Sequence, residues 1–405
     1  MPTTPTAALD DLVAAGQRAL ARADWGLARE RFEAAVAAGP SAAAWAGLAW
    51  AGWWLDDAAL TTRAREESYR AYLRDGDVER AAEAAAWLGS DHREFRGDDA
   101  VSNGWLARAE RMLEGREPGA AHGWLLLIHA ELAMNERCDP FEAEALSRQA
   151  IDLGRQLGIP DLEAVSLARL GATHVVRGQV EHGMRMLDEA SALATHERFV
   201  LGFSPGWTLC ILVAACDQVG DLPRASQWCD LMRTVTEQWK GRHMMGVCRA
   251  SYGSVLTTGG QWQRADEELS AAVSEVQVTR PGAAASGQVR LGELRRRQGR
   301  ADEARDLFER SLPDPGAVLG LGRILLDDGD PASAADAAER VLRRLQPAAV
   351  LDRVPALELL ARARCAAGDR EGAAAAAHEL QATIEEVETP YLVGRARQIL
   401  GEVEL

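Results

Sequence analysis

The pentapeptide Gly202-Phe203-Ser204-Pro205-Gly206 matches the Gly-x-Ser-x-Gly pattern that carries the nucleophilic serine of many hydrolases. That chemistry needs a strand before the serine and a helix after it, which together hold the hydroxyl on a sharp turn. No strand-like alternation of apolar and polar residues precedes this serine. The pentapeptide is therefore interpreted as a helix start, with Ser204 as the N-cap and Pro205 at the first helical position.

A second group that could do chemistry is Asp91, His92 and Glu94, which lie close together on one predicted helix. Two carboxylates can serve as acid and base if their environments separate their pKa values. On a charged helix such residues are usually solvated, and that interpretation is adopted here. The eight histidines show no His-Glu-x-x-His or other paired spacing typical of zinc ligands. The sequence therefore predicts no catalytic residue, no metal, no cofactor and no enzyme activity.

The strongest pattern is an internal repeat, which sets the elements that position every other residue. In each copy a turn glycine is followed five residues later by a small residue and four residues after that by a packing residue, as in Gly299, Ala304 and Phe308. A further glycine stands seven residues before several turns, which implies close contact with the next helix. Most steps between turns are 39–42 residues. The turns are expected near 23, 56, 97 and 138 and at Gly178, Gly220, Gly260, Gly299, Gly329 and Gly368.

The predicted fold is all-α, a tetratricopeptide-like α-solenoid that forms a right-handed superhelix of about ten antiparallel helix pairs. A helical hairpin cannot bury its apolar face alone, so the pairs must stack into one continuous core without separate domains. The abundance of Ala, Leu, Arg and Glu agrees with helices. The expected pairs span 7–40, 41–75, 77–116, 120–158, 160–197, 203–240, 242–278, 281–313, 315–346 and 351–388, and 390–405 forms a capping or half-repeat helix.

The Leu-Gly, Gly-Asp/Gln, Ala, Phe/Leu and Pro pattern resembles the tetratricopeptide repeat. The period near 40 is similar to the longer repeats in the effector regions of bacterial LuxR-type (MalT-like) transcription regulators, and segments 53–59, 290–300 and 356–360 resemble actinobacterial examples. Such regulators carry a helix-turn-helix domain, and some carry a Walker phosphate loop, but this sequence shows neither. The resemblance implies either the sensor part of a regulator or a stand-alone repeat protein derived from one.

In a tetratricopeptide hairpin the first helix lines the concave face, and its inward positions lie two, three, six, ten and thirteen residues before the turn. Counting back from each turn predicts an aromatic and acidic groove in the first half and a basic step late in the chain. Large aromatic side chains in a concavity suit a peptide or a small apolar ligand, although for any single Trp packing between helices is the favoured interpretation. The predicted concave residues are Trp50, Trp53, Trp54, Trp87, Asp91, Glu94, Phe95, Asn135, Glu136, Trp207, Asp217, Gln218, Ser254, Thr257, Glu293, Arg296 and Arg297.

Three functions follow from this reading. The favoured one is a non-enzymatic binding solenoid, the sensor region of a LuxR-type regulator, whose groove binds a protein, a peptide or a small apolar ligand. The first alternative is a stand-alone adaptor whose acidic groove binds a basic segment of a protein partner. The least favoured alternative is an enzyme with a pocket inside the solenoid.

The formal net charge of −16 is spread evenly along the chain. Such a surface repels phosphate backbones, so this chain alone is not expected to bind nucleic acid. The one basic run, Arg295-Arg296-Arg297 with Arg290 and Arg300 nearby, is interpreted as a solvated helix end, with a phosphate contact as the alternative.

The cysteines and the apolar runs predict a cytoplasmic protein. Segment 1–6 lacks the basic and apolar regions of a secretory signal, and the longest apolar run, 124–128, is too short to cross a membrane. A homo-oligomer is compatible with the sequence, which leaves the oligomeric state open. The six cysteines form no CxxC pair and are predicted to be buried free thiols of a reducing compartment: Cys138, Cys210, Cys216, Cys229, Cys248 and Cys365.

Overall fold

The computed structural model describes residues 5–196, 202–239, 242–385, 387 and 389–404. Within these ranges the chain forms 21 helices and no strand, which confirms the predicted fold class. The helices are α1 (Pro5–Leu20), α2 (Trp25–Ala38), α3 (Ala42–Trp54), α4 (Ala58–Arg74), α5 (Val78–Arg96), α6 (Asp99–Leu113), α7 (Ala120–Asn135), α8 (Pro140–Leu157), α9 (Pro160–Val176), α10 (Val180–His196), α11 (Phe203–Val219), α12 (Leu222–Trp239), α13 (Arg242–Thr258), α14 (Trp262–Thr279), α15 (Pro281–Arg297), α16 (Ala301–Arg310), α17 (Pro315–Asp327), α18 (Pro331–Arg344), α19 (Val350–Ala366), α20 (Arg370–Glu385) and α21 (Pro390–Glu404).

Tight turns join the two helices of each hairpin, and each contains a residue in the left-handed backbone region. At Gly299 the φ angle is +77° and an added Cβ would meet nothing within 4 Å, so the backbone conformation, not crowding, favours glycine there. The residues with positive φ at the ten turns are Ala23, Asp56, Gly97, Cys138, Gly178, Gly220, Gly260, Gly299, Gly329 and Gly368. Every predicted turn is therefore confirmed, whereas the repeat boundaries stay a prediction.

The glycines seven residues before the turns allow the helices of a pair to approach closely. A Cβ added at Gly292 would lie 2.7 Å from the ring of the fully buried Phe308, and one at Gly171 would lie 2.8 Å from the carbonyl oxygen of Gly183. The predicted packing role of these two positions is confirmed. Aspartates directly after several turns begin the second helix: Asp57 and Asp330 accept a hydrogen bond from the backbone N–H three residues on.

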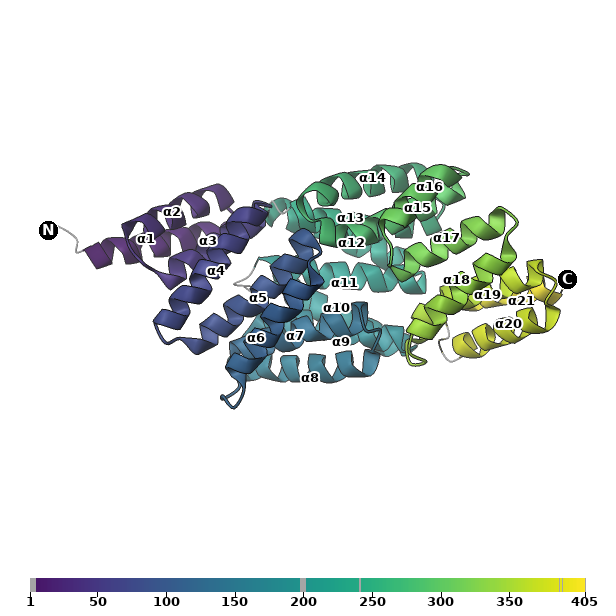
Figure 1. Ribbon diagram of the computed structural model, residues 1–405, viewed down its shortest axis with the longest axis horizontal. Coiled ribbons are helices and arrows are strands. Elements are labelled where there is room, and N and C mark those ends of the chain that lie inside the picture. The colour runs from purple at the N-terminus through teal and green to yellow at the C-terminus, as the bar shows by residue number, and fades with distance from the viewer. Residues whose placement is uncertain (1–4, 197–201, 240–241, 386, 388, 405) are drawn as a thin grey trace.

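The stacked hairpins form an elongated molecule with its termini at opposite ends (Figure 1). Helices ten positions apart in the chain come into contact, α5 with α15 and α9 with α19, so the solenoid winds back on itself after five pairs. One hydrophobic cluster runs from Ala23 to Ile399, beside smaller satellite clusters. The predicted continuous core is therefore present.

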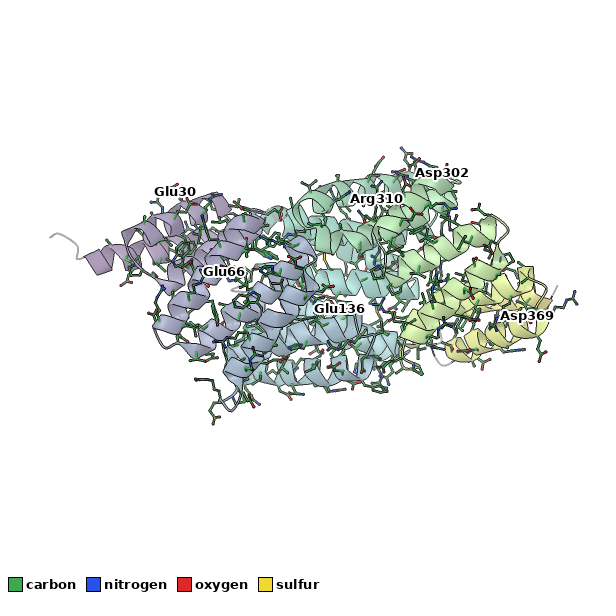
Figure 2. All side chains as sticks on the ribbon, in the orientation of Figure 1. Glu30, Glu66, Glu136, Asp302, Arg310 and Asp369 are labelled. Carbon is green, nitrogen blue, oxygen red and sulfur yellow. A yellow bond between two sulfur atoms is a disulfide. The ribbon has the colours of Figure 1, made fainter. Side chains whose placement is uncertain are left out.

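Acidic residues are distributed along the outside of the molecule. Figure 2 shows Glu30, Glu66, Glu136, Asp302 and Asp369 from one end of the ribbon to the other, in agreement with evenly spread charge. No helix within the described ranges is both long enough and apolar enough to span a bilayer.

The segment that resembles a hydrolase serine turn is the start of α11, as predicted, but Ser204 is not its N-cap. The helix begins at Phe203, with Gly202 in the cap position and Ser204 buried in the first turn. The Ser204 hydroxyl donates a hydrogen bond of 2.7 Å to Asp161 at the start of α9. Its side chain therefore joins two neighbouring hairpins instead of capping its own helix.

The prediction of six free cysteines is wrong for two of them, because Cys210 and Cys248 form a disulfide. These residues lie on α11 and α13, the first helices of adjacent hairpins, and their Cα atoms are 5.2 Å apart. Their separation of 38 residues is close to one repeat period, which places them side by side when hairpins stack. Cys138, Cys216 and Cys229 are buried thiols, and Cys365 is partly exposed.

Candidate functional site

A cavity of about 380 Å³ lies between the N-terminal and the middle hairpins, and we call it the aromatic cavity. Its walls come from α3, α5, α7, α11, α13 and α15, with one residue from α6. The first helices of the hairpins therefore line the interior, as the resemblance implied. The predicted concave residues in these walls are Trp50, Trp53, Trp87, Glu94, Asn135 and Trp207.

Phe203 forms the centre of the aromatic cluster, and sequence reasoning missed it. Its ring centroid lies 5.2 Å from that of Trp50, 5.7 Å from Trp53 and 5.6 Å from Trp87. Trp207, one helical turn further along α11, is 5.9 Å away. Phe203 is 4% exposed, so it fills part of the concavity that the tryptophans enclose. The remaining space is bounded by half-buried indoles, which suits an apolar group of a ligand.

Trp54 does not belong to the cavity. It stacks on Trp25 of α2 with a centroid distance of 4.4 Å and an interplanar angle of 2°, and it is 6% exposed. Successive residues of a helix point about 100° apart, so Trp53 faces the interior while Trp54 packs between hairpins. Packing is therefore the role that the structure gives Trp54.

Arg280, at the junction of α14 and α15, binds two residues of the wall of the aromatic cavity from the next superhelical turn, Trp53 and Glu94. Its side chain is fully buried and donates 2.9 Å and 2.6 Å hydrogen bonds to Asp56 and to the carbonyl oxygen of Trp53. It also pairs with Glu94, and its guanidinium lies 4.2 Å from the ring centroid of Phe95. Its partners stand 186 to 227 residues away, so no local signal could have shown this role.

Gly282 allows α15 to lie directly on α5. A Cβ at this position would come within 1.9 Å of the carbonyl oxygen of Arg93, a distance that no side chain can occupy. Gly282 and Ala283 both line the aromatic cavity. The small residues at the start of α15 therefore form the wall that Arg280 holds in place.

The group Asp91, His92 and Glu94 is not solvated as expected. Asp91 is 1% exposed and accepts a 2.6 Å hydrogen bond from Arg65 of α4, whose guanidinium lies over the ring of Trp50. His92 is also buried. Burial raises the pKa of the Asp91 carboxyl, and the Arg65 cation opposes that effect. Arg65 and Asp91 thus form a buried ion pair that packs against Trp50 of the aromatic cavity. Replacing either residue by a neutral one would leave the charge of the other uncompensated.

The remaining predicted residues of the middle helices connect distant hairpins. Gln218 of α11 donates a 2.7 Å hydrogen bond to Asp352 of α19, and Asp217 lies 3.9 Å from Arg290 of α15. Burial raises the pKa of Asp352 to about 6, and the Gln218 amide partly offsets this. Neither Asp217 nor Gln218 lines the aromatic cavity.

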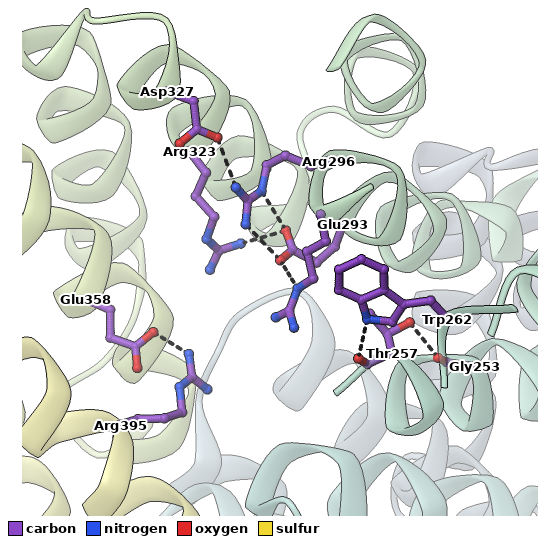
Figure 3. Close-up of polar contacts among 10 residues, drawn as sticks. Gly253, Thr257, Trp262, Glu293, Arg296, Arg323, Asp327, Glu358 and Arg395 are labelled. Atoms are coloured by element: carbon purple, nitrogen blue, oxygen red, sulfur yellow. Dashed lines mark hydrogen bonds and ion pairs between the residues drawn. The ribbon is translucent and has the colours of Figure 1, made fainter. Parts of the chain in front are cut away.

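Ser254 and Thr257 also lie away from that cavity. The Thr257 hydroxyl donates to the carbonyl oxygen of Gly253 at 2.8 Å, and its own carbonyl accepts a hydrogen bond from the Trp262 indole (Figure 3). Ser254 is partly buried, and its hydroxyl lowers the pKa of Asp217, which burial raises. Glu136 is exposed at the end of α7 and forms an ion pair with Arg93.

A second cavity, of about 420 Å³, contains the basic residues predicted late in the chain, and we call it the arginine cavity. It is lined by α13, α15, α19 and α21. The prediction that the run Arg295-Arg296-Arg297 is solvated is wrong for Arg295 and Arg296. Arg295 is buried on Asp266 at 2.7 Å, and Arg296 binds Glu293 and Asp327 at 3.1 and 3.0 Å (Figure 3). Arg297 is 39% exposed.

Glu293 is the shared anion of this region. Burial alone would raise its pKa, but the cations Arg323, Arg296 and Arg297 hold the pKa of Glu293 at about 2. Glu293 is therefore ionised at all physiological pH values. Within the part of the chain that the structure describes, no three His, Cys, Asp or Glu side chains are grouped so that they could hold a metal ion.

The sequence matches no known protein family and no curated protein. Among solved structures, the chain is similar to a Rap protein complexed with Competence and Sporulation Factor, with a TM-score of 0.60 and 13% sequence identity over 88% of this chain and 100% of that one. It also matches yeast Tom70 with a TM-score of 0.43 and 12% identity, covering 98% of this chain and 95% of that one. A tetratricopeptide repeat protein from Parabacteroides merdae matches with a TM-score of 0.41 and 14% identity, covering 70% and 99%. At these identities the likeness establishes the tetratricopeptide-like helical repeat fold alone.

Proposed function

We propose that this chain is a non-enzymatic binding solenoid whose aromatic cavity holds an apolar group of a protein, a peptide or a small ligand. The observation that carries the proposal is the ring of indoles around Phe203, placed on inner helices and enclosing about 380 Å³. Ligand cavities fall in the range of about 300–1,000 Å³ and combine mostly apolar walls with a few polar groups. The Rap structure of the same fold holds Competence and Sporulation Factor, and we infer that this chain likewise binds a partner.

The polar groups of the aromatic cavity are mostly neutralised within the protein. Glu131 is held by Arg169 at 2.7 Å, and Glu94 is held by Arg280. The buried hydroxyl of Ser102 has no hydrogen-bond partner among the described residues and lies in the cavity wall, where it can bond a polar atom of a ligand. The occupant is therefore an apolar group with one or two polar atoms instead of a charged one.

The sequence resemblance extends the proposal to a biological role. The phrases shared with LuxR-type regulators suggest a cytoplasmic sensing region, in which an occupied cavity favours one curvature of the solenoid over another. Because Gly282 and Ala283 of α15 line the cavity together with residues of α3 and α5, a bound group contacts both superhelical turns at once. Through its contacts with both turns, a bound group would favour one curvature of the solenoid.

The test uses the neutral dye N-phenyl-1-naphthylamine, whose fluorescence rises in apolar cavities. The full chain should bind the dye, and Trp207→Ala should weaken the binding by about tenfold or more, because aromatic side chains dominate such contacts. Trp207 is preferable to Trp87 as a target because it is half-buried, so its removal disturbs the core less.

Trp54→Ala is the matched control, since Trp54 lies on the same cluster of helices but outside the cavity. This variant should lose stability while keeping dye affinity within about twofold. Equal loss of affinity in both variants, or no binding by the unmodified chain, would show that the indoles are core alone and that the proposal is wrong.

A further inference from the structure

We propose that the arginine cavity is a second binding site, which takes a small molecule presenting a phosphate or carboxylate dianion. The cavity is lined by Arg296 and Arg297 of α15, Arg362 of α19 and Arg395 of α21, against one lining carboxylate, Glu358. This local positive charge occurs in a chain whose net charge is −16. Guanidinium groups bind both oxyanions through paired N–H donors, which a single ammonium cannot do.

Within the part of the chain that the structure describes, several guanidinium donors at or beside the arginine cavity have no hydrogen-bond partner. Arg323 of α17 is not one of the lining residues, but it lies beside them through Glu293, with which it forms an ion pair of 3.7 Å, and it has no hydrogen bond among the described residues. Arg297 donates from Nε to Glu293 at 2.8 Å, and neither of its Nη groups has a partner in the same part of the chain. Figure 3 shows the guanidinium groups of Arg323 and Arg395 directed into the space between α15, α17 and α21. An oxyanion in that space would satisfy donors that the fold leaves free.

The acidic residues nearby offset most of this charge and leave one cation in excess. Arg362 is held by Glu402 of α21 at 2.7 Å, so five guanidinium groups, including that of Arg323, face four carboxylates. Glu293 is shared by three guanidinium groups, those of Arg296, Arg297 and Arg323. Asp327 pairs with Arg296 from an exposed position, where its charge is screened. Glu358 pairs with Arg395, yet its second oxygen is buried and has no hydrogen-bond partner in the described ranges.

Partial burial supports a specific site over a solvated patch of charge, since the side chains of Arg296, Arg323 and Arg395 are 21%, 26% and 31% exposed. Burial lowers the pKa of Arg323, and Glu293 opposes that effect, so the fold holds this cation at a cost that a bound anion would reduce. The volume of about 420 Å³ exceeds that of a bare ion, so the charged group of the ligand comes with further atoms.

The experiment is isothermal titration calorimetry of the full chain with inorganic phosphate and, separately, with succinate, at neutral pH and low salt. At least one of the two dianions should bind. Binding of phosphate alone assigns the site to phosphorylated molecules, whereas binding of succinate as well extends it to dicarboxylates. Absence of binding by both would overturn the proposal.

Two substitutions change the charge of the site in opposite directions. Arg323→Gln should weaken binding by about tenfold or more, and Glu358→Gln should strengthen it several-fold, since a misfolded variant cannot gain affinity. The control is Arg343→Gln, because Arg343 is 67% exposed on α18 and outside the cavity. Equal affinities of the Arg323 and Arg343 variants, or weaker binding by the Glu358 variant, would contradict the assignment. Dye binding in the aromatic cavity should stay unchanged in all three, so the two proposals fail separately.

Discussion

The aromatic cavity and the arginine cavity occupy corresponding places in the repeat but carry opposite chemistry. Trp53 and Arg296 each stand three residues before their turn, on the first helix of a hairpin, and each faces a cavity of similar size, about 380 and 420 Å³. The repeat therefore determines which positions face inward, and the residue at each position determines what can bind there. The two proposals therefore assign an apolar group and an anion to cavities formed by the same helical repeat.

The two regions also differ in how their charges are held. Around the aromatic cavity, Arg280 and Arg65 are almost fully buried, and each is matched to its own carboxylates. In the C-terminal half, Arg296, Arg297 and Arg323 share Glu293 and remain partly exposed. The first arrangement makes each cation essential to packing, whereas the second leaves charge available to a ligand.

The largest expected effect follows from Arg280→Ala. This change leaves Asp56 and Glu94 beside a cavity without their cation, which should lower the free energy of unfolding by about 5 kcal/mol. Arg297→Ala, at an exposed position of the arginine cavity, should cost less than about 1 kcal/mol. Urea denaturation followed by far-ultraviolet circular dichroism measures both. Similar losses of stability in the two variants would contradict the proposed difference between the cations of the two cavities.

Phe203→Ala should have the next largest effect, about 3–4 kcal/mol, because it empties the centre of the aromatic cluster. Phe141→Ala is the matched control: Phe141 is 55% exposed on α8 and should cost less than about 1 kcal/mol. The same denaturation curves, with tryptophan fluorescence as a second signal, check this prediction. A loss below about 1 kcal/mol at Phe203 would mean that the cluster adds little to stability.

Asp352→Asn should stabilise the protein at alkaline pH. The pKa of Asp352 is raised from 3.8 to about 6, so the folded state binds its proton more tightly, and stability falls as the pH rises between those values. The asparagine keeps the oxygen that accepts from Gln218 and should add about 1–2 kcal/mol at pH 8. No gain is expected at pH 4, where Asp352 is mostly protonated when folded. A gain that is equal at the two pH values would contradict the electrostatic explanation.

The smallest expected effect is the response of the two sites to salt. Raising NaCl from about 0.05 to 0.5 M should weaken dianion binding in the arginine cavity several-fold, because charge attraction is screened. Binding of the neutral dye in the aromatic cavity should change by less than about twofold. Calorimetry and dye fluorescence on the same preparation measure both. Parallel responses would indicate a shared site.

The sequence predicts local features of this protein well. Each turn residue lies at a helix–helix junction, and Gly171 and Gly292 pack as expected, because both depend on neighbours within one hairpin. Trp50, Trp53 and Trp207 line one cavity because the inward face follows from counting back from a turn. Counting back from the turn also placed Trp54 on the inward face, but its side chain packs against Trp25 between two hairpins.

What sequence reasoning missed depends on contacts between distant parts of the chain. Phe203 and Arg280 enter the aromatic cluster from later hairpins, and Arg65 neutralises Asp91 from another helix. The pairing of Cys210 with Cys248 likewise requires knowing how neighbouring hairpins stack. Residue spacing along one helix cannot contain this information, because superhelical curvature decides it.

The contact between α5 and α15 has a consequence for how the molecule unfolds. In a solenoid whose repeats touch only their nearest neighbours, melting starts at an end and spreads as in a one-dimensional chain. Here each superhelical turn also contacts the next one. Unfolding a middle hairpin therefore breaks contacts with its neighbours in the chain and with the adjacent superhelical turn. The central hairpins should therefore exchange their amide hydrogens as one cooperative block, while α1 and α2, which lie outside this overlap, fray independently.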